Sequence, residues 1–587
     1  DLGTLFPLAL LAIVAILILM YRDLIDMLVS VGCLIVAIIW TFGFGVMAGV
    51  GVSTVSMAVP ILVLGLGIDY GLHLVFRYRE KRTDGGSIEE SSGYTLSTVG
   101  EALLLATFTT VVAFLSYLTS SMQMLADFGV LSALGIVSSF IIMMLVIPAT
   151  QALRERRAES KGKVLTDSYR YRDRKSEGRD IIGDISGIGG RMAASKPLVA
   201  LAITGIVLVG FGYGAANVSY EFDLFDFLPE GTEGAELLQF IFEEFDSTGM
   251  STASVLIYGD ATDPQLIKAM ETSISRMLNT PDVINVSGSV QAQYIGSVLF
   301  GAYNVTANGT YNVLYPAFFN VSNGAILNGT TQSDVQTLVF LLVSEQEPEI
   351  LANLASVVGT YDGRNVTQIL VPVSDVIDND EALALRGSLN QDIQPITDLD
   401  AEAIVTSANI ANAVVMDEMS DSQMQSLIIT LAFTVLALSM VMLYLYRAPM
   451  LGVLAVIPTL VSVVAVWGTM FILDISLNVM TLTIAALTVG MGVTYGIHIT
   501  HRFNAELSDG RSVEDAVRRT TRQTGKGVLG AALTTSVGFA IIGFSAMVPM
   551  QQFGIITAMA ILYSYLGASL VLPSMLVLWG RRRAIKS

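Results

Sequence analysis

Leu64–Arg79 reads LGLGIDYGLHLVFRYR, and Val489–Asn504 reads VGMGVTYGIHITHRFN. The two stretches stand 425 residues apart, and six of their sixteen positions are identical, whereas composition alone predicts about one match. The identical pairs are Gly65/Gly490, Gly67/Gly492, Tyr70/Tyr495, Gly71/Gly496, His73/His498 and Arg77/Arg502. A match of this kind indicates an internal repeat of the chain.

Composition places both copies of the repeat in a membrane. Hydrophobic residues make up 53% of the 587 residues and charged residues 14%, against about 25% charged residues in soluble domains. A helix of about 20 apolar residues crosses a hydrocarbon core of about 30 Å, and lipid cannot satisfy an open backbone. Eleven runs meet this length: 4–20, 27–48, 53–76, 101–120, 126–150, 197–215, 427–446, 450–472, 478–500, 526–547 and 553–579.

The 425-residue offset holds over five of these runs without a gap. Further matches are Tyr21-Arg22 with Tyr446-Arg447, Thr109-Thr110 with Thr534-Thr535, Phe114 with Phe539, Phe128-Gly129 with Phe553-Gly554, and Pro148 with Pro573. Both copies run in the same direction through the membrane. The sequence therefore predicts two parallel five-helix repeats related by an axis along the membrane normal.

Basic residues predict the orientation. Segments 77–100, 151–196, 501–525 and 580–587 are rich in arginine and lysine, and short basic loops stay in the cytoplasm. Alternating crossings then place residues 216–425 outside a plasma membrane. The expected organisation is a first repeat (1–150), a cytoplasmic basic linker (151–196), a helix (197–215), an exterior domain (216–425), a second repeat (426–580) and a cytoplasmic tail (581–587).

The predicted exterior segment differs in character from the rest of the chain. It carries 29 acidic and 4 basic residues, and all seven Asn-X-Ser/Thr acceptor sequences begin in it. Such sequences mark surface loops of translocated chains, although an Asn- and Thr-rich surface without glycans is the alternative. The candidate glycosylation sites are Asn217, Asn285, Asn304, Asn308, Asn320, Asn328 and Asn365. The acidic surface with few lysines favours a salt-loving archaeal source.

The exterior segment predicts an α+β domain. Strands are expected at 253–258, 283–286, 335–343 and 368–373, and a helix at 263–278 with Asp263 as its N-cap. Residues 291–333 have the composition of a decorated insertion, and 222–229 (FDLFDFLP) join the domain to the preceding helix. Cys33 is the only cysteine, so no disulfide within the chain supports this domain.

The two repeats differ in what precedes them. The second follows a helix and the exterior domain, whereas the first begins at Asp1. By symmetry we expect one further helix and one further exterior domain ahead of residue 1. A natural chain with a single exterior domain is the alternative.

These features resemble the resistance-nodulation-division (RND) superfamily, in the branch of the mycobacterial MmpL proteins, hopanoid transporters and the Patched and Dispatched proteins. The resemblance lies in GIDYG at 67–71, GVTYG at 492–496, FDFLPE at 225–230 and the helix order. It implies porter-like exterior domains and ion-driven movement of lipids or other hydrophobic molecules. Many relatives carry an acid in both motifs, whereas this chain has Thr494 opposite Asp69.

Asp69 is the leading candidate for ion coupling. It stands eight residues before Arg77, or about 12 Å along a helix, and therefore near mid-membrane. A carboxylate at that depth faces protein or water and is by default functional. The alternative is a protonated Asp69 with a structural role, in which its side chain forms hydrogen bonds between packed helices. We expect Asp69 and Thr494 to face each other between the repeats.

Several neighbours complete the candidate site. His73 lies one turn from Asp69, and His498 stands in the same relation to Thr494, so both are candidates for passing protons or for simple interfacial placement. The resemblance to the family's Asp-Tyr relay favours a role for Tyr70, with Tyr495 as its counterpart. The repeat glycines Gly65, Gly67, Gly71, Gly490, Gly492 and Gly496 are expected to permit close helix packing. Possible relay hydroxyls are Thr109, Thr110, Thr534 and Thr535, although membrane threonines more often bond their own backbone.

The leading functional hypothesis is an exporter of a lipid-like or hydrophobic substrate driven by H⁺ or Na⁺. The alternatives are a lipid or sterol-type sensor on the same fold and an accessory subunit of protein translocation. No nucleophile elbow, metal-spaced His/Cys cluster or phosphate loop occurs, so neither an enzyme, a metal site nor a cofactor is expected. Membrane lipids are the expected partners, nucleic acid is not, and assembly into a homo-oligomer stays open.

Overall fold

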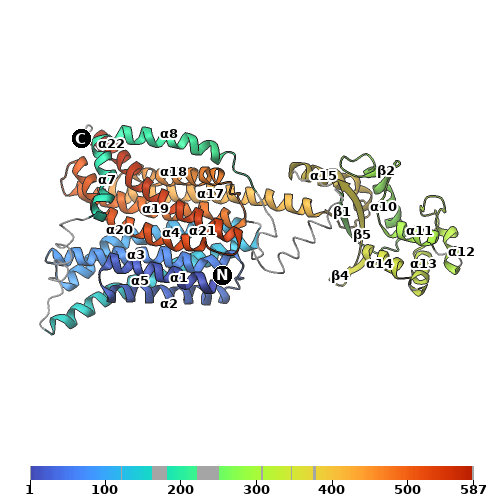
Figure 1. Ribbon diagram of the computed structural model, residues 1–587, viewed down its shortest axis with the longest axis horizontal. Coiled ribbons are helices and arrows are strands. Elements are labelled where there is room, and N and C mark those ends of the chain that lie inside the picture. The colour runs from blue at the N-terminus through green and yellow to red at the C-terminus, as the bar shows by residue number, and fades with distance from the viewer. Residues whose placement is uncertain are drawn as a thin grey trace. The chain divides into compact units, whose positions relative to one another are not determined.

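The computed structural model describes residues 2–120, 122–161, 181–220, 250–305, 309–345, 347–374 and 379–584. The chain divides into two compact units, residues 1–235 with 418–587, and residues 236–417. The first is helical and the second combines helices with strands (Figure 1). Eleven helices among the described residues are long and apolar enough to cross a membrane, which confirms the predicted number.

Within the described residues, each repeat contains five membrane-spanning helices, and they come in the same order in both repeats. The first repeat contains α1 (Leu2–Tyr21), α2 (Leu24–Met47), α3 (Val59–Thr83) after the 3₁₀ turn η1 (Val55–Ala58), α4 (Ile88–Leu115) with the 3₁₀ turn η2 (Ser116–Thr119), and α5 (Gln123–Glu159). The second contains α17 (Ala408–Tyr446), α18 (Met450–Ile472), α19 (Val479–Ser508), α20 (Val513–Ile542), and α21 (Val548–Leu566), which continues through the π-helical η4 (Gly567–Val571) into α22 (Leu572–Ala584).

The structure keeps the 425-residue offset almost residue by residue. The last residues of α2 and α18, of α3 and α19, and the first residues of α4 and α20 are all 425 apart. Even the left-handed turn residues correspond: Arg22 with Arg447 (φ 50° and 51°), Gly49 with Asp474, and Gly85 with Gly510. The helix ends and turns of the structure thereby confirm the gap-free repeat.

Helices α4 and α20 begin 13 residues before the apolar runs that predicted them, at 101 and 526. Ser87 caps α4 by accepting a hydrogen bond from the N–H of Glu90 (3.0 Å), and Ser512 caps α20 by accepting one from Asp515 (3.2 Å). Hydropathy detects only the apolar part of a helix, whereas these caps fix where it starts. The extra turns lie at the end of the bundle where α1, α3 and α5 finish, which we call the basic end.

Part of the expected basic linker is helical. Residues 181–195 form α7 (Ile181–Ser195), which packs against α20, and α8 (Pro197–Ala215) follows at once. A Cβ on Gly190 would collide with the side chain of Thr521, and one on Gly189 with the carbonyl of Ser569. This glycine pair therefore allows the close approach of α7 to the second repeat.

At the basic end, the first repeat holds a buried ionic network. Asp26 accepts hydrogen bonds from Gln151 (2.8 Å) and Arg154 (2.9 Å) and pairs with Arg79, while Arg154 also donates to Asp23 (2.5 Å). The second repeat has apolar or uncharged residues at these positions. The counterparts of Asp23, Asp26, Arg79, Gln151 and Arg154 are Ala448, Leu451, Asn504, Leu576 and Trp579. Four of them belong to one hydrophobic cluster, from which Asn504 is missing.

The second unit is built on a four-stranded antiparallel sheet. Its order is β4 (Val358–Tyr361), β5 (Arg364–Ser374), β1 (Met250–Tyr258) and β6 (Ala403–Thr406), and a separate hairpin pairs β2 (Asn285–Val286) with β3 (Ser289–Val290). The predicted strands at 253–258 and 368–373 lie within β1 and β5. The predicted helix is α10 (Pro264–Met277), with Asp263 accepting a hydrogen bond from the N–H of Gln265 at its start.

One prediction for this unit is wrong. Residues 335–343 form no strand but lie in α13 (Gln332–Glu345), because Val335, Leu338 and Leu342 recur with helical spacing and are buried. Residues 291–333, predicted as a decorated insertion, also contribute to the core of the unit. They form α11 (Ile295–Val305) and α12 (Thr310–Phe318), whose Tyr311 and Tyr315 are fully buried in the core. The unit is completed by α14 (Pro348–Val357), α15 (Asn379–Asp392) and α16 (Gln394–Thr397).

Most candidate glycosylation sites lie at the surface. Exposed asparagines are Asn217, Asn285, Asn304, Asn328 and Asn365, and Asn320 is half-buried. Asn320 accepts hydrogen bonds from the N–H and hydroxyl of Ser322, so its own side chain stabilises a turn. Asn308 and the joining segment 222–229 lie outside the described residues.

Candidate functional site

The two motif helices are the most enclosed of the bundle. The membrane-spanning stretch of α19 is entirely buried and that of α3 nearly so. Each packs against a helix of the other repeat, α3 on α20 and α19 on α4. The motif residues therefore stand where the two repeats meet.

Two threonines hold this interface by exchanged hydrogen bonds. The hydroxyl of Thr535 donates to the carbonyl of Gly65 (2.7 Å), and that of Thr110 donates to the carbonyl of Gly490 (3.2 Å) and also to Ala106 on its own helix (2.8 Å). The pairs are equivalent under the 425-residue offset. Thr109 and Thr534 instead donate to carbonyls of their own helices, Leu105 with Ala106, and Gly530 with Ala531. The contacts of these four threonines are thus to backbone carbonyls.

The repeat glycines bring neighbouring groups close. A Cβ on any of them would meet an atom within 3.1 Å. The neighbours are Thr535 for Gly65, Leu34 and Ser139 for Gly67, Tyr21 for Gly71, Thr110 for Gly490, Thr459 for Gly492 and the carbonyl of Ala455 for Gly496. Side chains at these positions would separate the helices that carry the site.

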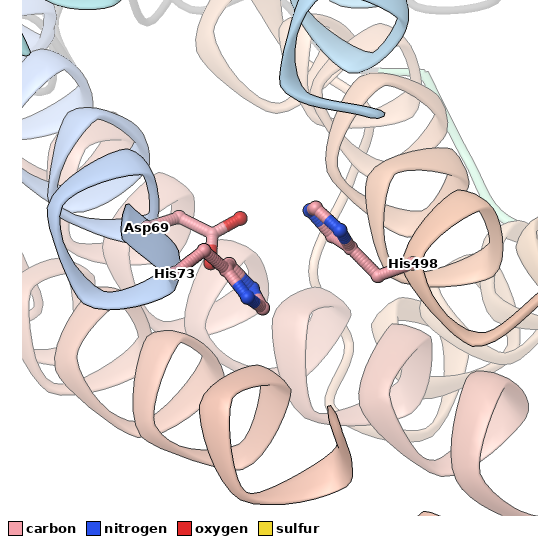
Figure 2. Close-up of side chains that lie close together, drawn as sticks. All are labelled: Asp69, His73 and His498. Carbon is pink, nitrogen blue, oxygen red and sulfur yellow. The ribbon is translucent and has the colours of Figure 1, made fainter. Parts of the chain in front are cut away.

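Asp69, His73 and His498 form the centre of the site (Figure 2). Nε2 of His73 lies 3.0 Å from Oδ1 of Asp69, one turn away on α3. The His73 ring stacks on the His498 ring of α19, with centroids 4.1 Å apart and planes 20° apart. All three residues are buried, with 5%, 9% and 5% of their surfaces exposed. The two histidines therefore meet across the repeats. That Asp69 and Thr494 face each other stays a prediction.

Three polar atoms of this centre lack a hydrogen bond in the described structure. They are Oδ1 of Asp69, Nε2 of His73 and Nε2 of His498. The Asp69–His73 contact is short enough for a hydrogen bond, but its angle does not align the N–H with the oxygen. Buried polar atoms without partners are costly, so such a cluster is suited to taking up an ion or a water molecule.

A cavity of about 1070 Å³ reaches this centre from the basic end. It is lined by buried His73 and His498 and by exposed Arg518, Arg519 and Arg522, so it extends from the surface to the histidine pair. Its further charged lining residues are Arg22, Arg77, Arg79, Arg502, Lys526, Glu80 and Asp84. Water and small ions therefore have a path to the buried centre.

The remaining candidates have separate partners. The hydroxyl of Tyr70 accepts a hydrogen bond from Thr107 (3.0 Å), and its ring contacts Phe140 edge-on. The hydroxyl of Thr494 donates to Gly490 on its own helix (3.0 Å). Tyr495 is buried on α19. Thr107 was not predicted, because its only signal is a position two residues before the repeated Thr109-Thr110.

A multi-pass membrane protein, built from two parallel repeats with an ionisable centre between them, is the class that this fold and site define. Residues 1–177 and 380–587 match the MMPL family, which is more than half of the chain, and the protein therefore belongs to the MMPL family. This membership agrees with the resemblance to the RND superfamily.

Curated relatives match parts of the chain. The putative membrane protein MJ1562 of Methanocaldococcus jannaschii is 33% identical over 147 residues, covering 25% of this chain and 38% of that protein. The hopanoid transporter HpnN of Rhodopseudomonas palustris is 28% identical over 116 residues (20% and 13%), and the probable transport protein MmpL12 of Mycobacterium tuberculosis is 29% identical over 184 residues (31% and 16%). The matched stretches thus span well under half of these relatives.

A solved structure matches nearly the whole chain. The hedgehog release protein Disp of the water bear Hypsibius dujardini superposes with a TM-score of 0.68 over 99% of this chain and 70% of its own, at 14% identity. At this identity the likeness concerns the fold alone.

Proposed function

We propose that the protein exports a lipid-like or other hydrophobic molecule across the plasma membrane, driven by a gradient of H⁺ or Na⁺. Asp69 binds the coupling ion, and His73 and His498 connect it with the cavity at the basic end. Residues 216–425 lie outside the cell in this proposal, and the basic segments lie inside.

One observation carries the proposal, namely a buried carboxylate between two repeats, next to a histidine pair that lines a cavity. Asp69 has 5% of its surface exposed, and an Oδ1 atom without a hydrogen bond. Ionisable groups inside a membrane bundle are expensive, and where they occur they mark ion pathways. A relay is the simplest use of a buried carboxylate that contacts the cavity only through a histidine.

The relatives support the choice of substrate class. HpnN is named a hopanoid transporter, and the MmpL relatives are named transport proteins. A hopanoid is a rigid hydrophobic lipid, so a lipid-like cargo is the natural expectation for this chain. These two matches cover 20% and 31% of the chain, and the cargo is therefore proposed by class.

The test is transport in vesicles under imposed proton and sodium gradients. Asp69→Asn keeps the shape of the side chain but removes its charge change, and we expect gradient-driven transport to be lost while the protein still folds and binds substrate. Asp127→Asn is the matched control, because Asp127 is a half-buried acid at the start of α5 whose partner is Gln123 (2.8 Å). Normal transport by Asp69→Asn under both gradients would refute the proposal.

A sensor or passive binding protein is the second candidate, and the observation that favours it is Thr494. With Thr494 in place of a second acid, the repeat interface has no pair of coupled carboxylates at these two positions to titrate together. If the wild-type chain binds lipid without gradient-dependent flux, the sensor is the better interpretation. Thr494→Ala should weaken transport only partly, since its hydroxyl is already bonded to Gly490.

A further inference from the structure

We propose that Asp69, His73 and His498 bind one divalent transition-metal ion of the Zn²⁺ type between the two repeats. One nitrogen from each histidine and one carboxylate oxygen of Asp69 all lie within 4.8 Å of one another. Two of the residues come from α3 and the third from α19, so the site exists only in the folded bundle. The metal site is tested separately from transport, and a bound metal ion would compete with the coupling ion for the Asp69 carboxylate.

The donor set suits zinc. Imidazole nitrogen and carboxylate oxygen bind Zn²⁺ at about 2.0–2.2 Å, which places tetrahedral ligand atoms about 3.3 Å apart. The Asp69–His73 pair already stands at 3.0 Å. The His498 nitrogen lies within 4.8 Å of the other two ligand atoms, so its side chain must shift for all three to bind one ion. Ca²⁺ and Mg²⁺ are poor alternatives because they take about six or more oxygen ligands.

The surroundings support a metal ion in three ways. The unpartnered atoms Oδ1 of Asp69, Nε2 of His73 and Nε2 of His498 are candidate ligands, each more than nine-tenths buried by residue. The cavity gives an ion a path to His73 and His498 and leaves space for water as a fourth ligand. A Cβ on Gly527 would lie 3.0 Å from the His73 ring, so the glycine leaves that ring its space.

Nearby positive charges are partly balanced by acids. Arg77 pairs with Glu80 (2.6 Å), Arg502 pairs with Glu506 (2.8 Å), and Arg79 pairs with Asp26. The cations closest in sequence to the histidines therefore have carboxylate partners. A bound metal ion would tie α3 to α19 and so hold the two repeats together.

The chain is well suited to a direct binding test, since it has three histidines and one cysteine. Purified protein stripped with a chelator is titrated with Zn²⁺ alone, and with Co²⁺ as a spectroscopic probe, in the absence of substrate or gradient. We expect one ion per chain and the intense visible bands of four-coordinate Co²⁺. His73→Gln and His498→Gln should each weaken binding by at least about tenfold, since the loss of a mere supporting partner of a ligand costs about 10–100-fold.

His501→Gln and Cys33→Ser are the matched controls and should leave binding unchanged. The thermal midpoint without metal checks that each variant is folded. X-ray absorption of the Co²⁺-loaded wild type counts imidazole ligands, so the site is tested even if a variant fails to fold. Two imidazoles support the site, whereas absence of binding, loss with His501→Gln, or fewer than two imidazoles would overturn it. Transport is measured separately, so failure here leaves the transport proposal standing.

Discussion

Gly65→Ala tests how closely the two repeats pack. A Cβ at position 65 would lie 2.6 Å from Cγ2 of Thr535, and 3.4 Å from its Cβ. At the equivalent Gly490, the nearest atom would be Cγ2 of Thr110 at 3.1 Å. The first substitution therefore forces the helices or the threonine to shift, whereas the second requires the neighbour to give by only a few tenths of an ångström.

The size of the effect follows from two opposing terms. Overpacking an interior costs about 1–3 kcal/mol, and alanine in place of glycine within a helix returns about 1 kcal/mol. Gly65→Ala should therefore destabilise the protein by up to about 2 kcal/mol, and Gly490→Ala should be close to neutral. Adding Thr535→Ser to Gly65→Ala removes the clashing methyl group but keeps the hydroxyl that donates to Gly65, so most of the loss should be recovered.

The assay is thermal unfolding of the purified protein in a single detergent. Gly205→Ala on α8 is the control for helix propensity alone, because nothing lies within 4 Å of a Cβ at that position. Gly65→Ala should have the lowest midpoint, with the double variant and Gly490→Ala near wild type. The packing argument fails if Gly65→Ala unfolds no earlier than Gly205→Ala, or if Thr535→Ser leaves its midpoint unchanged.

Three further predictions concern the ionic network, the topology and a buried acid. Asp26→Leu alone should destabilise the first repeat by about 3–5 kcal/mol because it strips Arg79 and Arg154 of a buried partner, and exchanging the whole set for the second repeat's residues should restore the thermal midpoint; equal midpoints for both would contradict this. Protease added to intact cells should cut within 216–425 and spare 151–196, and cleavage of the linker from outside would reverse the orientation. Burial raises the pKa of Glu271 above its ordinary value, so the folded state holds the proton more tightly and stability falls as pH rises through the folded pKa. The protection factors of the amides in 264–277, from which the intrinsic rise of exchange with pH has been removed, should fall over that pH range in wild type and not in Glu271→Gln, and identical profiles would argue against it.

The membrane part of the fold was predictable because lipid cannot hydrogen-bond the backbone, so each span must be a long apolar helix. Apolar length gave the eleven spans, and the repeat gave the correspondence between halves. Helix starts such as Ser87 and Ser512 were missed, because these caps begin polar turns that a search for apolar runs does not detect. In the second unit, the run 335–343 misled because a short apolar run suits a strand or a helix equally, and only burial of Val335, Leu338 and Leu342 decides.

The candidate site was predictable residue by residue but not as a constellation. The Asp69–His73 spacing places both on one helix face, and this is what the structure shows. The stack of His73 on His498 requires two residues 425 apart to meet, which depends on how the repeats pack. The predicted axis between the repeats nevertheless pointed to this stack. Residues close to such an axis lie near their own counterparts, and His73 and His498 are counterparts in the repeat.

The ionic network of one repeat and the apolar cluster of the other give the basic end two kinds of temperature response. Hydrophobic burial weakens on cooling, whereas the desolvation penalty of buried ion pairs falls on warming. Around Leu451 and Trp579 the bundle should therefore loosen in the cold, while the network around Asp26 gains in relative strength with heat. If the two repeats had identical residues at the basic end, temperature would change the stability of both equally. Because they differ, warming should favour the first repeat relative to the second, and cooling should weaken the second.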